Sequence, residues 1–205
     1  MAGVKGQVQR RGVERRKAIV QAELELFTLR GARGTSIADV AEKVGISPPA
    51  VLHHFGTKAD LLLAVVAERD RRAAGAFLDV LGTGGLTGIA GLVRGAAQNE
   101  RERGLVSCYV VLEAENLQQG DIAHRYFVDR SWVMRNALCE AIAQGQRSGE
   151  IRVDVDAELK AAEIVAFMEG AAVQWSLDPS LSLVGLYRSY FDMVVRDLAA
   201  TTSVD

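Results

Sequence analysis

Apolar residues recur every three or four positions along nearly the whole chain of 205 residues, and runs of β-branched residues with a period of two are absent. Spacing of this kind is typical of amphipathic α-helices and not of strands. The sequence therefore predicts an all-α protein with about nine helices. We expect these helices at residues 12–30, 36–44, 48–54, 58–81, 85–101, 105–119, 122–147, 156–177 and 181–199.

The short helices near the N-terminus have strong boundary signals. Ser36 precedes Asp39 by three residues, and Thr57 precedes Asp60 by the same interval, which is the spacing of a capping box. Gly45 stands where helices commonly end in a left-handed residue. The sequence therefore predicts four segments. They are a flexible basic tail (residues 1–11), an N-terminal helix-turn-helix domain (12–60), a C-terminal helical bundle (61–199) and a short C-terminal tail (200–205).

Two consecutive prolines, Pro48 and Pro49, begin the third predicted helix. The first four N–H groups of a helix have no internal partner, so proline costs little there and its fixed φ favours helix initiation. Ser47 supplies an N-cap, and the turn from Val44 to Ile46 is too short for anything except two helices at a steep angle. A helix, a short turn with glycine and a second helix form a helix-turn-helix, whose second helix enters the DNA major groove.

Charge is distributed unevenly along the chain, although the net charge is only −2. Residues 1–60 contain ten Lys or Arg and six Asp or Glu, whereas residues 61–205 contain fourteen and twenty, respectively. A basic front end on an acidic body suggests a polyanionic partner for the front end alone. A basic tail that is merely solvated is the alternative.

The stretch from Arg16 to Leu63 resembles the DNA-binding domain of the tetracycline-repressor (TetR) family of bacterial transcription regulators. The resemblance rests on Ile19, Ala22 and Phe27, followed by TSIADVAEKVGIS from residue 35 and LHHFGTKADLL from residue 52. It implies a homodimer that binds a near-palindromic operator in double-stranded DNA through a helix-turn-helix head, with a ligand-binding and dimerisation domain behind it. Repression is the commoner mode in the family; a transcriptional activator and an interaction-only helical module without DNA binding are the alternatives.

The residues expected to contact DNA gather around the second helix of the motif. Its small, rigid start allows close approach to a thymine methyl group, while two histidines one turn later and a lysine at the next helix start can reach phosphates. Pro49 replaces a glycine that many family members have. Leu52 replaces a common tyrosine and has no hydroxyl, so the phosphate contact is assigned to His53. The predicted contact residues are Arg16, Thr35, Ser36, Ser47, Pro48, Pro49, Ala50, His53, His54 and Lys58.

The C-terminal domain is less informative, because members of the family diverge there. The resemblance implies a pocket for a small-molecule effector of unknown identity, whose binding shifts the helix at residues 58–81 and lowers operator affinity. Glu113 follows a strongly apolar run, so it either contacts the ligand or reaches an arginine or solvent. The aromatic candidates are alternatively plain core. The predicted pocket residues are Phe77, Tyr109, Leu112, Glu113, Trp132 and Trp175.

The helices at residues 156–177 and 181–199 are apolar over more than half of their circumference. A helix packed on one side needs only about a 100° stripe. The surplus predicts a two-fold dimer in which both helices of each chain form a four-helix bundle, with a larger intrachain core as the alternative. The predicted interface residues are Ile164, Met168, Ala171, Ala172, Trp175, Leu183, Tyr187, Tyr190 and Val194.

Other classes of protein are disfavoured. The sequence contains no nucleophile-elbow, phosphate-loop, dinucleotide or zinc-protease motif, so we expect neither an enzyme nor a cofactor. His53 and His54 are about seventy residues from His124, which predicts no metal site. Cys108 and Cys139 lie in apolar surroundings without a CxxC motif, as in reduced cytoplasmic proteins. No apolar run reaches the roughly 18 residues of a membrane span.

Overall fold

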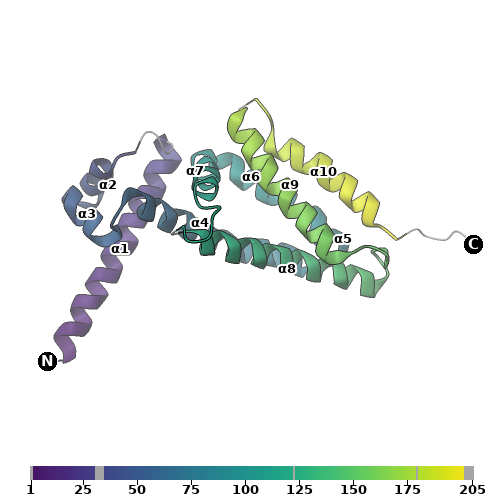
Figure 1. Cartoon of the computed structure of the whole chain (residues 1–205), viewed down its shortest axis with the longest axis horizontal. Helices are drawn as coiled ribbons and strands as arrows, with labels where there is room; N and C mark the ends of the chain where they lie inside the picture. Colours follow the sequence, from purple (N-terminus) through teal and green to yellow (C-terminus); the bar gives the residue numbers. More distant parts are fainter. Residues whose placement is uncertain (1, 31–34, 122, 179, 201–205) are drawn as a thin grey trace, which may run out of the picture. The chain divides into compact units, whose positions relative to one another are not determined.

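The computed structural model describes the backbone of residues 2–30, 35–121, 123–178 and 180–200, and the side chains of these residues except 2–9 and 28–30. Within them the chain is helical almost throughout (Figure 1), which confirms the all-α prediction, and one isolated antiparallel bridge joins Ile151 to Ala199. Of the predicted C-terminal tail, only Ala200 lies inside the described residues. The helices are α1 (Ala2–Arg30), α2 (Ile37–Val44), α3 (Pro48–Phe55), α4 (Lys58–Gly82), α5 (Gly85–Gly91), α6 (Val93–Arg101), α7 (Arg103–Ala114), α8 (His124–Ser148), α9 (Ala157–Leu177) and α10 (Leu183–Leu198).

Two helices depart from the predicted boundaries near the start and the middle of the chain. Helix α1 begins at Ala2 instead of residue 12, since Lys, Gln and Arg in the intervening segment are good helix formers. The predicted helix 85–101 is divided at Leu92 into α5 and α6. The division follows Gly91, where Val80 packs so closely that an added Cβ atom would lie 2.6 Å from its Cγ1 atom.

Helix α7 ends at Ala114, before the predicted end at residue 119. Asn116 accounts for the early end, because its side-chain carbonyl accepts a hydrogen bond from the Ala123 N–H at 3.1 Å and its backbone carbonyl lies 3.0 Å from Nδ1 of His124. These bonds turn the chain towards the start of α8. Residue 122, the predicted start of that helix, lies outside the described residues.

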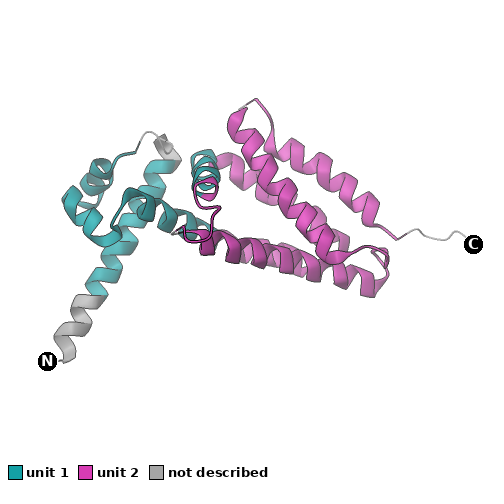
Figure 2. Ribbon diagram, viewed as in Figure 1, with its two compact units in different colours: residues 1–71, 103–112 teal, residues 72–102, 113–205 magenta. Residues whose placement is uncertain are grey.

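The chain divides into two compact units (Figure 2). Unit 1 comprises residues 1–71 and 103–112, and unit 2 comprises residues 72–102 and 113–205. The division falls inside α4, later than the predicted boundary at residue 60. The reason is that Leu61, Val65 and Val66 in the first turns of α4 are fully buried and belong to the core of unit 1.

Unit 1 is built on a small apolar core to which α1, α2, α3 and the start of α4 contribute. Helix α2 packs against both α1 and α3. The helical spacing of the apolar residues places them on the inward faces, as an amphipathic pattern requires. The buried residues of the first three helices include Ile19, Ala22, Leu26, Phe27, Val40, Ala41, Val51 and Phe55.

Hydrogen bonds fix the helix ends of the motif. At the start of α2, the Asp39 N–H donates to Ser36 Oγ at 3.2 Å and the Ser36 N–H donates to Asp39 Oδ2 at 2.7 Å. Thr57 and Asp60 repeat this reciprocal pattern at the start of α4, at 3.0 and 3.1 Å. Gly45 ends α2 with φ +72°, a left-handed conformation that favours glycine and lets the chain turn at once into α3.

Unit 2 is a helical bundle in which α8 packs on α5 and α9, while α10 packs on α5, α6 and α9. Glu100 of α6 binds the start of α10, because its Oε1 atom accepts hydrogen bonds from the Val184 N–H at 3.0 Å and the Ser182 hydroxyl at 3.2 Å. One face of α9 and one face of α10 are buried in the bundle core, and the opposite face of each helix lies outside this core.

No single helix among the described residues is long and apolar enough to cross a membrane. Helices α3 and α4, which meet at 68°, reach the required length and composition only when the two are counted together.

Candidate nucleic-acid interface

Helix α3 has one face buried in unit 1 and one face in solvent. Val51 and Phe55 lie one turn apart and are both buried, which fixes the rotation of the helix about its axis. The opposite face therefore presents the first helical turn to solvent. Its exposed residues are Ser47, Pro48, Pro49, Leu52 and His53, with Ala50 and His54 half-buried.

The two prolines change the role of Ser47. An N-cap hydroxyl ordinarily accepts a hydrogen bond from the N–H of the second or third helical residue. Pro49 has no N–H at the second position, and the N–H of Ala50 at the third position donates to the Ser47 carbonyl at 2.9 Å. The Ser47 hydroxyl consequently makes no capping hydrogen bond and remains on an exposed residue, where it can donate to a phosphate.

Arg16 of α1 holds the other end of α3. Its guanidinium donates a hydrogen bond of 2.6 Å to the carbonyl of His54 and lies 4.0 Å from the ring centroid of Phe55. The last carbonyls of a helix have no internal partner and favour a nearby positive charge, so this contact stabilises the C-terminal end of α3. Arg16, predicted to contact DNA, thus has a positioning role that its sequence position did not reveal.

Three more of the predicted contact residues have partners inside unit 1. Thr35 is only 3% exposed, and its carbonyl accepts a hydrogen bond of 2.8 Å from Nζ of Lys58. The Ser36 hydroxyl belongs to the capping box of α2. Burial thus withdraws the Thr35 side chain from contact with DNA, because this threonine fills the junction before α2, and the amine of Lys58 ties that junction to the start of α4.

A buried carboxylate, Glu23, lies beneath the motif. Its side chain is 1% exposed, and neither carboxylate oxygen has a hydrogen-bond partner among the described residues. Burial raises the pKa of Glu23 to about 7; the nearby charge of Lys58 opposes the rise and that of Asp39 adds to it. The sequence contains a signal that Glu23 is buried, because this residue is four positions from both Ile19 and Phe27 on the buried face of α1.

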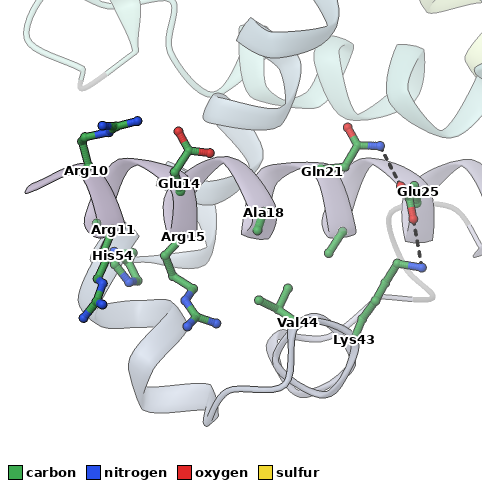
Figure 3. A pocket seen from close by; sticks show the side chains of 12 residues that line it. Arg10, Arg11, Glu14, Arg15, Ala18, Gln21, Glu25, Lys43, Val44 and His54 are labelled. Carbon is green, nitrogen blue, oxygen red and sulfur yellow. Dashed lines mark hydrogen bonds and ion pairs between the residues drawn. The ribbon is translucent and has the colours of Figure 1, made fainter. Parts of the chain in front are cut away.

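An open groove of about 1100 Å³ runs between α1, the end of α2 and the end of α3 (Figure 3). Two of its acidic residues have cationic partners: Glu25 pairs with Lys43 at 3.0 Å, and Glu14 pairs with Lys17 at 3.6 Å. Sequence analysis singled out the basic N-terminus but not a groove. The lining residues are Arg10, Arg11, Gly12, Glu14, Arg15, Ala18, Gln21, Ala22, Glu25, Lys43, Val44 and His54.

The residues predicted to line an effector pocket divide between the two units. Tyr109 and Leu112 are buried in unit 1, whereas Trp175 is buried in unit 2. Phe77 and Glu113 are half-buried in unit 2. The pocket therefore remains a prediction for these five residues.

Unit 2 contains a charged cluster of which sequence analysis named only Glu113. Burial raises the pKa of Glu169 on α9, the charge of Glu113 adds to the rise, and Arg130 and Arg135 of α8 oppose it. Trp132, by contrast, is 61% exposed on the same helix, α8. Its exposure argues against the predicted role in a pocket, because a ligand-lining tryptophan is enclosed by its neighbours.

Most residues predicted to form the dimer interface are buried within the single chain. The core of the single chain therefore buries the more apolar face of each helix. Helical periodicity predicts that this face is buried, but it does not show whether the face packs against the same chain or against a second copy. The buried ones are Ile164, Ala171, Trp175, Leu183, Tyr187 and Val194, and the half-buried ones are Met168, Ala172 and Tyr190. A second apolar face stays exposed, with Val173 and Leu177 on α9 and Met193 on α10.

Comparison with known proteins gives matches at both ends of the chain. The family model described as "Bacterial regulatory proteins, tetR family" matches residues 19–65, and the model described as "BetI-type transcriptional repressor, C-terminal" matches residues 117–195. The HTH-type transcriptional regulator TtgR of Pseudomonas putida is 25% identical over 203 residues, covering 87% of this chain and 89% of TtgR. The HTH-type transcriptional repressor AcnR of Corynebacterium glutamicum is 23% identical over 155 residues, covering 76% of this chain and 78% of AcnR.

A solved structure agrees in fold. A TetR transcription regulator from Haloarcula marismortui superposes with a TM-score of 0.74 over 91% of this chain and 99% of its own, at 18% identity. The helix-turn-helix segment matches the first family model, the bundle matches the second, and similar regulators align along most of the length. The chain belongs to the TetR family of bacterial transcriptional regulators.

Proposed function

We propose that this protein is a ligand-responsive transcriptional repressor that binds operator DNA sequence-specifically as a homodimer. The observation that carries the proposal is the solvent-facing first turn of α3, a helix that is held rigidly at both ends. Two prolines fix its start, and the hydrogen bond from Arg16 to the His54 carbonyl fixes its end. A rigid helix loses little conformational freedom on binding, so its contact energy is available for discrimination between sequences.

The contacts with DNA fall into two classes. Pro48, Pro49 and Ala50 are apolar and small, so they suit van der Waals contact with thymine methyl groups in the major groove. The Ser47 hydroxyl and the exposed His53 lie at the edges of this turn and suit phosphate oxygens, which position the helix without reading sequence. Leu52, exposed where a tyrosine is common, adds apolar area but no hydrogen bond.

The dimer forms through the second apolar face of α9 and α10. Ala166, Gly170, Val173 and Leu177 recur at intervals of three or four residues on the exposed side of α9. Phe167 of α9 stacks on Tyr190 of α10 with ring centroids 3.6 Å apart, which holds the two helices side by side. Small residues allow close helix approach, and a two-fold pairing of this surface presents two copies of α3 to half-sites about 34–36 Å apart.

The effector is a small molecule bound by the bundle. Within unit 2, Phe77, Glu113 and Trp175 remain candidates, and Glu169 joins them because its carboxylate is near that of Glu113. Glu113 and Glu169 lie near Arg130 and Arg135, and a charged cluster of this kind can bind a polar group on the ligand. Binding shifts the population of bundle conformations and thereby lowers affinity for the operator.

Selection of bound duplexes from a random library tests the function. We expect one near-palindromic sequence to bind at least about 1000-fold more tightly than scrambled DNA at physiological salt. Affinity for both should fall steeply as salt rises, because phosphate contacts release counterions. Equal affinity for the selected and scrambled duplexes would contradict sequence-specific regulation and favour an interaction-only module.

A further inference from the structure

Glu23 is a buried acid that the proposed contacts with DNA and effector do not use. Its side chain is 1% exposed, and neither carboxylate oxygen accepts a hydrogen bond anywhere in the part of the chain that the structure describes. A buried carboxyl without a donor favours its neutral form, because the ionised form loses hydration and gains no replacement. Burial accordingly raises the pKa of Glu23 to about 7, so unit 1 contains a group that gains or loses a proton near neutral pH.

Two charged residues act on Glu23 from the helices packed around it. Lys58 at the start of α4 favours the ionised carboxylate, and Asp39 in the first turn of α2 disfavours it. Helix α3 contributes the apolar side chains of Val51 and Phe55 to the same core. Of the two charges, that of Lys58 is the one that stabilises ionised Glu23.

Lys58 connects this buried acid with the surface that is predicted to meet DNA. The residue is exposed, and its Nζ atom donates a hydrogen bond of 2.8 Å to the carbonyl of buried Thr35. It stands in the first turn of α4, where N–H groups without helical partners and a positive charge together favour a phosphate. A phosphate bound at Lys58 would offset the same ammonium charge that stabilises ionised Glu23.

We propose that operator binding is coupled to proton uptake by Glu23, so that DNA binds more tightly to the molecule whose Glu23 carboxyl is protonated. This inference rests on the proposed function, because it needs a duplex engaged by α3. Phosphates near Lys58 disfavour the ionised carboxylate in the complex. Since ionisation of Glu23 and binding of DNA then oppose each other, linkage requires that affinity fall as pH rises through 7.

Coulomb's law gives the size of the effect. One phosphate charge about 10 Å from Glu23 disfavours its ionised form by about one pKa unit at an effective dielectric constant of about 20. Starting from a pKa of about 7 in the free protein, affinity should fall about tenfold per subunit between pH 6 and pH 9. About half a proton per subunit should be taken up on binding at pH 7.5.

The test measures DNA affinity against pH for three full-length proteins, namely the wild type, Glu23→Gln and Glu25→Gln. Glu23→Gln keeps the shape of the side chain but cannot titrate, and Glu25→Gln removes an exposed carboxylate from the same helix. Dissociation constants for the selected operator and a scrambled duplex are measured by fluorescence anisotropy from pH 6 to pH 9 at constant salt. Calorimetry in two buffers of different ionisation enthalpy counts the protons taken up at pH 7.5.

Two other sources of pH dependence are controlled in this design. The exposed His53 is present in all three proteins, and histidines change charge in the lower part of this range, so the readout is the difference between variants. Circular dichroism at each pH follows the helix content of the free proteins.

The wild type and Glu25→Gln are expected to lose about tenfold more affinity per subunit than Glu23→Gln between pH 6 and pH 9. They should also take up about half a proton more per subunit at pH 7.5. Because the coupling acts through phosphates, the loss should be the same for operator and scrambled duplexes, which leaves the preference between them unchanged.

Three results would overturn the inference. Equal pH dependence and equal proton uptake in the wild type and Glu23→Gln would show that Glu23 is not coupled to DNA. A Glu25→Gln variant with the weak pH dependence of Glu23→Gln would assign the effect to the net charge of α1, and a matching loss of helix content would assign it to unfolding. A wild type that binds operator and scrambled duplexes equally at every pH would instead contradict the proposed function.

Discussion

Replacing Glu23 by Gln is expected to stabilise unit 1 most strongly above pH 7. The pKa of this carboxyl is raised from 4.5 to about 7 in the folded protein, chiefly by burial without a hydrogen-bond partner. One pKa unit corresponds to about 1.4 kcal/mol, so the ionised form costs the folded state about 3 kcal/mol once pH exceeds both values. Glutamine has nearly the same shape and no charge to bury, and therefore avoids this cost.

Proton binding by Glu23 determines whether the stability of unit 1 rises or falls with pH. Between pH 4.5 and 7 the folded protein holds the Glu23 proton while the unfolded chain has released it, so the wild type loses stability as pH rises through this window. The Gln variant has no such loss. Its advantage over the wild type should therefore grow by roughly 2–3 kcal/mol between pH 5 and pH 8.

Hydrogen exchange measured by mass spectrometry on the full chain reports this difference for unit 1 alone. Both tryptophans lie in unit 2, so intrinsic fluorescence does not follow unit 1. Peptides covering residues 35–66 are compared between variant and wild type at each pH, which cancels the intrinsic pH dependence of exchange. Glu25→Gln is the matched control, because Glu25 is an exposed carboxylate on the same helix, paired with Lys43. Its change should stay below about 1 kcal/mol. An advantage of Glu23→Gln that is constant from pH 5 to pH 8 would refute the reasoning.

Three other substitutions test separate parts of the account. Arg16→Ala should raise hydrogen exchange across α3 by an amount that corresponds to about 2 kcal/mol, since it removes both the charged hydrogen bond and the ring contact. Ala50→Glu should weaken operator binding more than about 100-fold in an anisotropy titration, because it places a carboxylate against phosphates. Ala74→Glu on exposed α4 should leave binding unchanged. Leu177→Glu should raise the dimer dissociation constant at least about 100-fold in sedimentation experiments, whereas Val153→Glu, equally exposed but outside α9 and α10, should not.

The helices of unit 1 could be predicted because their signals are local. The capping boxes at Ser36 and Thr57 and the left-handed Gly45 depend on residues within three or four positions of each other, and the structure contains all three. The break at Leu92 could not be predicted in the same way. It follows Gly91, against which Val80 packs closely, and no local pattern connects these two residues.

The same distinction explains the outcome for the dimer face. Periodicity shows that Ile164 and Leu183 avoid water, but it cannot say whether the other side of the contact is the same chain or a second copy. The structure buries both residues within the bundle. The exposed row of α9 that includes Leu177 also contains the small residues Ala166 and Gly170, so its apolar pattern is weaker than that of the buried face.

In the proposed complex, affinity and specificity for DNA depend on different residues. Thr35 is buried and Arg16 is engaged with α3, so two of the polar candidates nearest the motif serve the internal structure of unit 1. The turn proposed to meet the bases, from Ser47 to Ala50, is uncharged, and its proposed contacts depend on shape. Exposed cationic residues such as Arg11 and Arg15 can add affinity that depends on salt and not on sequence. Ala50→Glu should therefore abolish the preference for the operator while leaving part of the salt-dependent affinity.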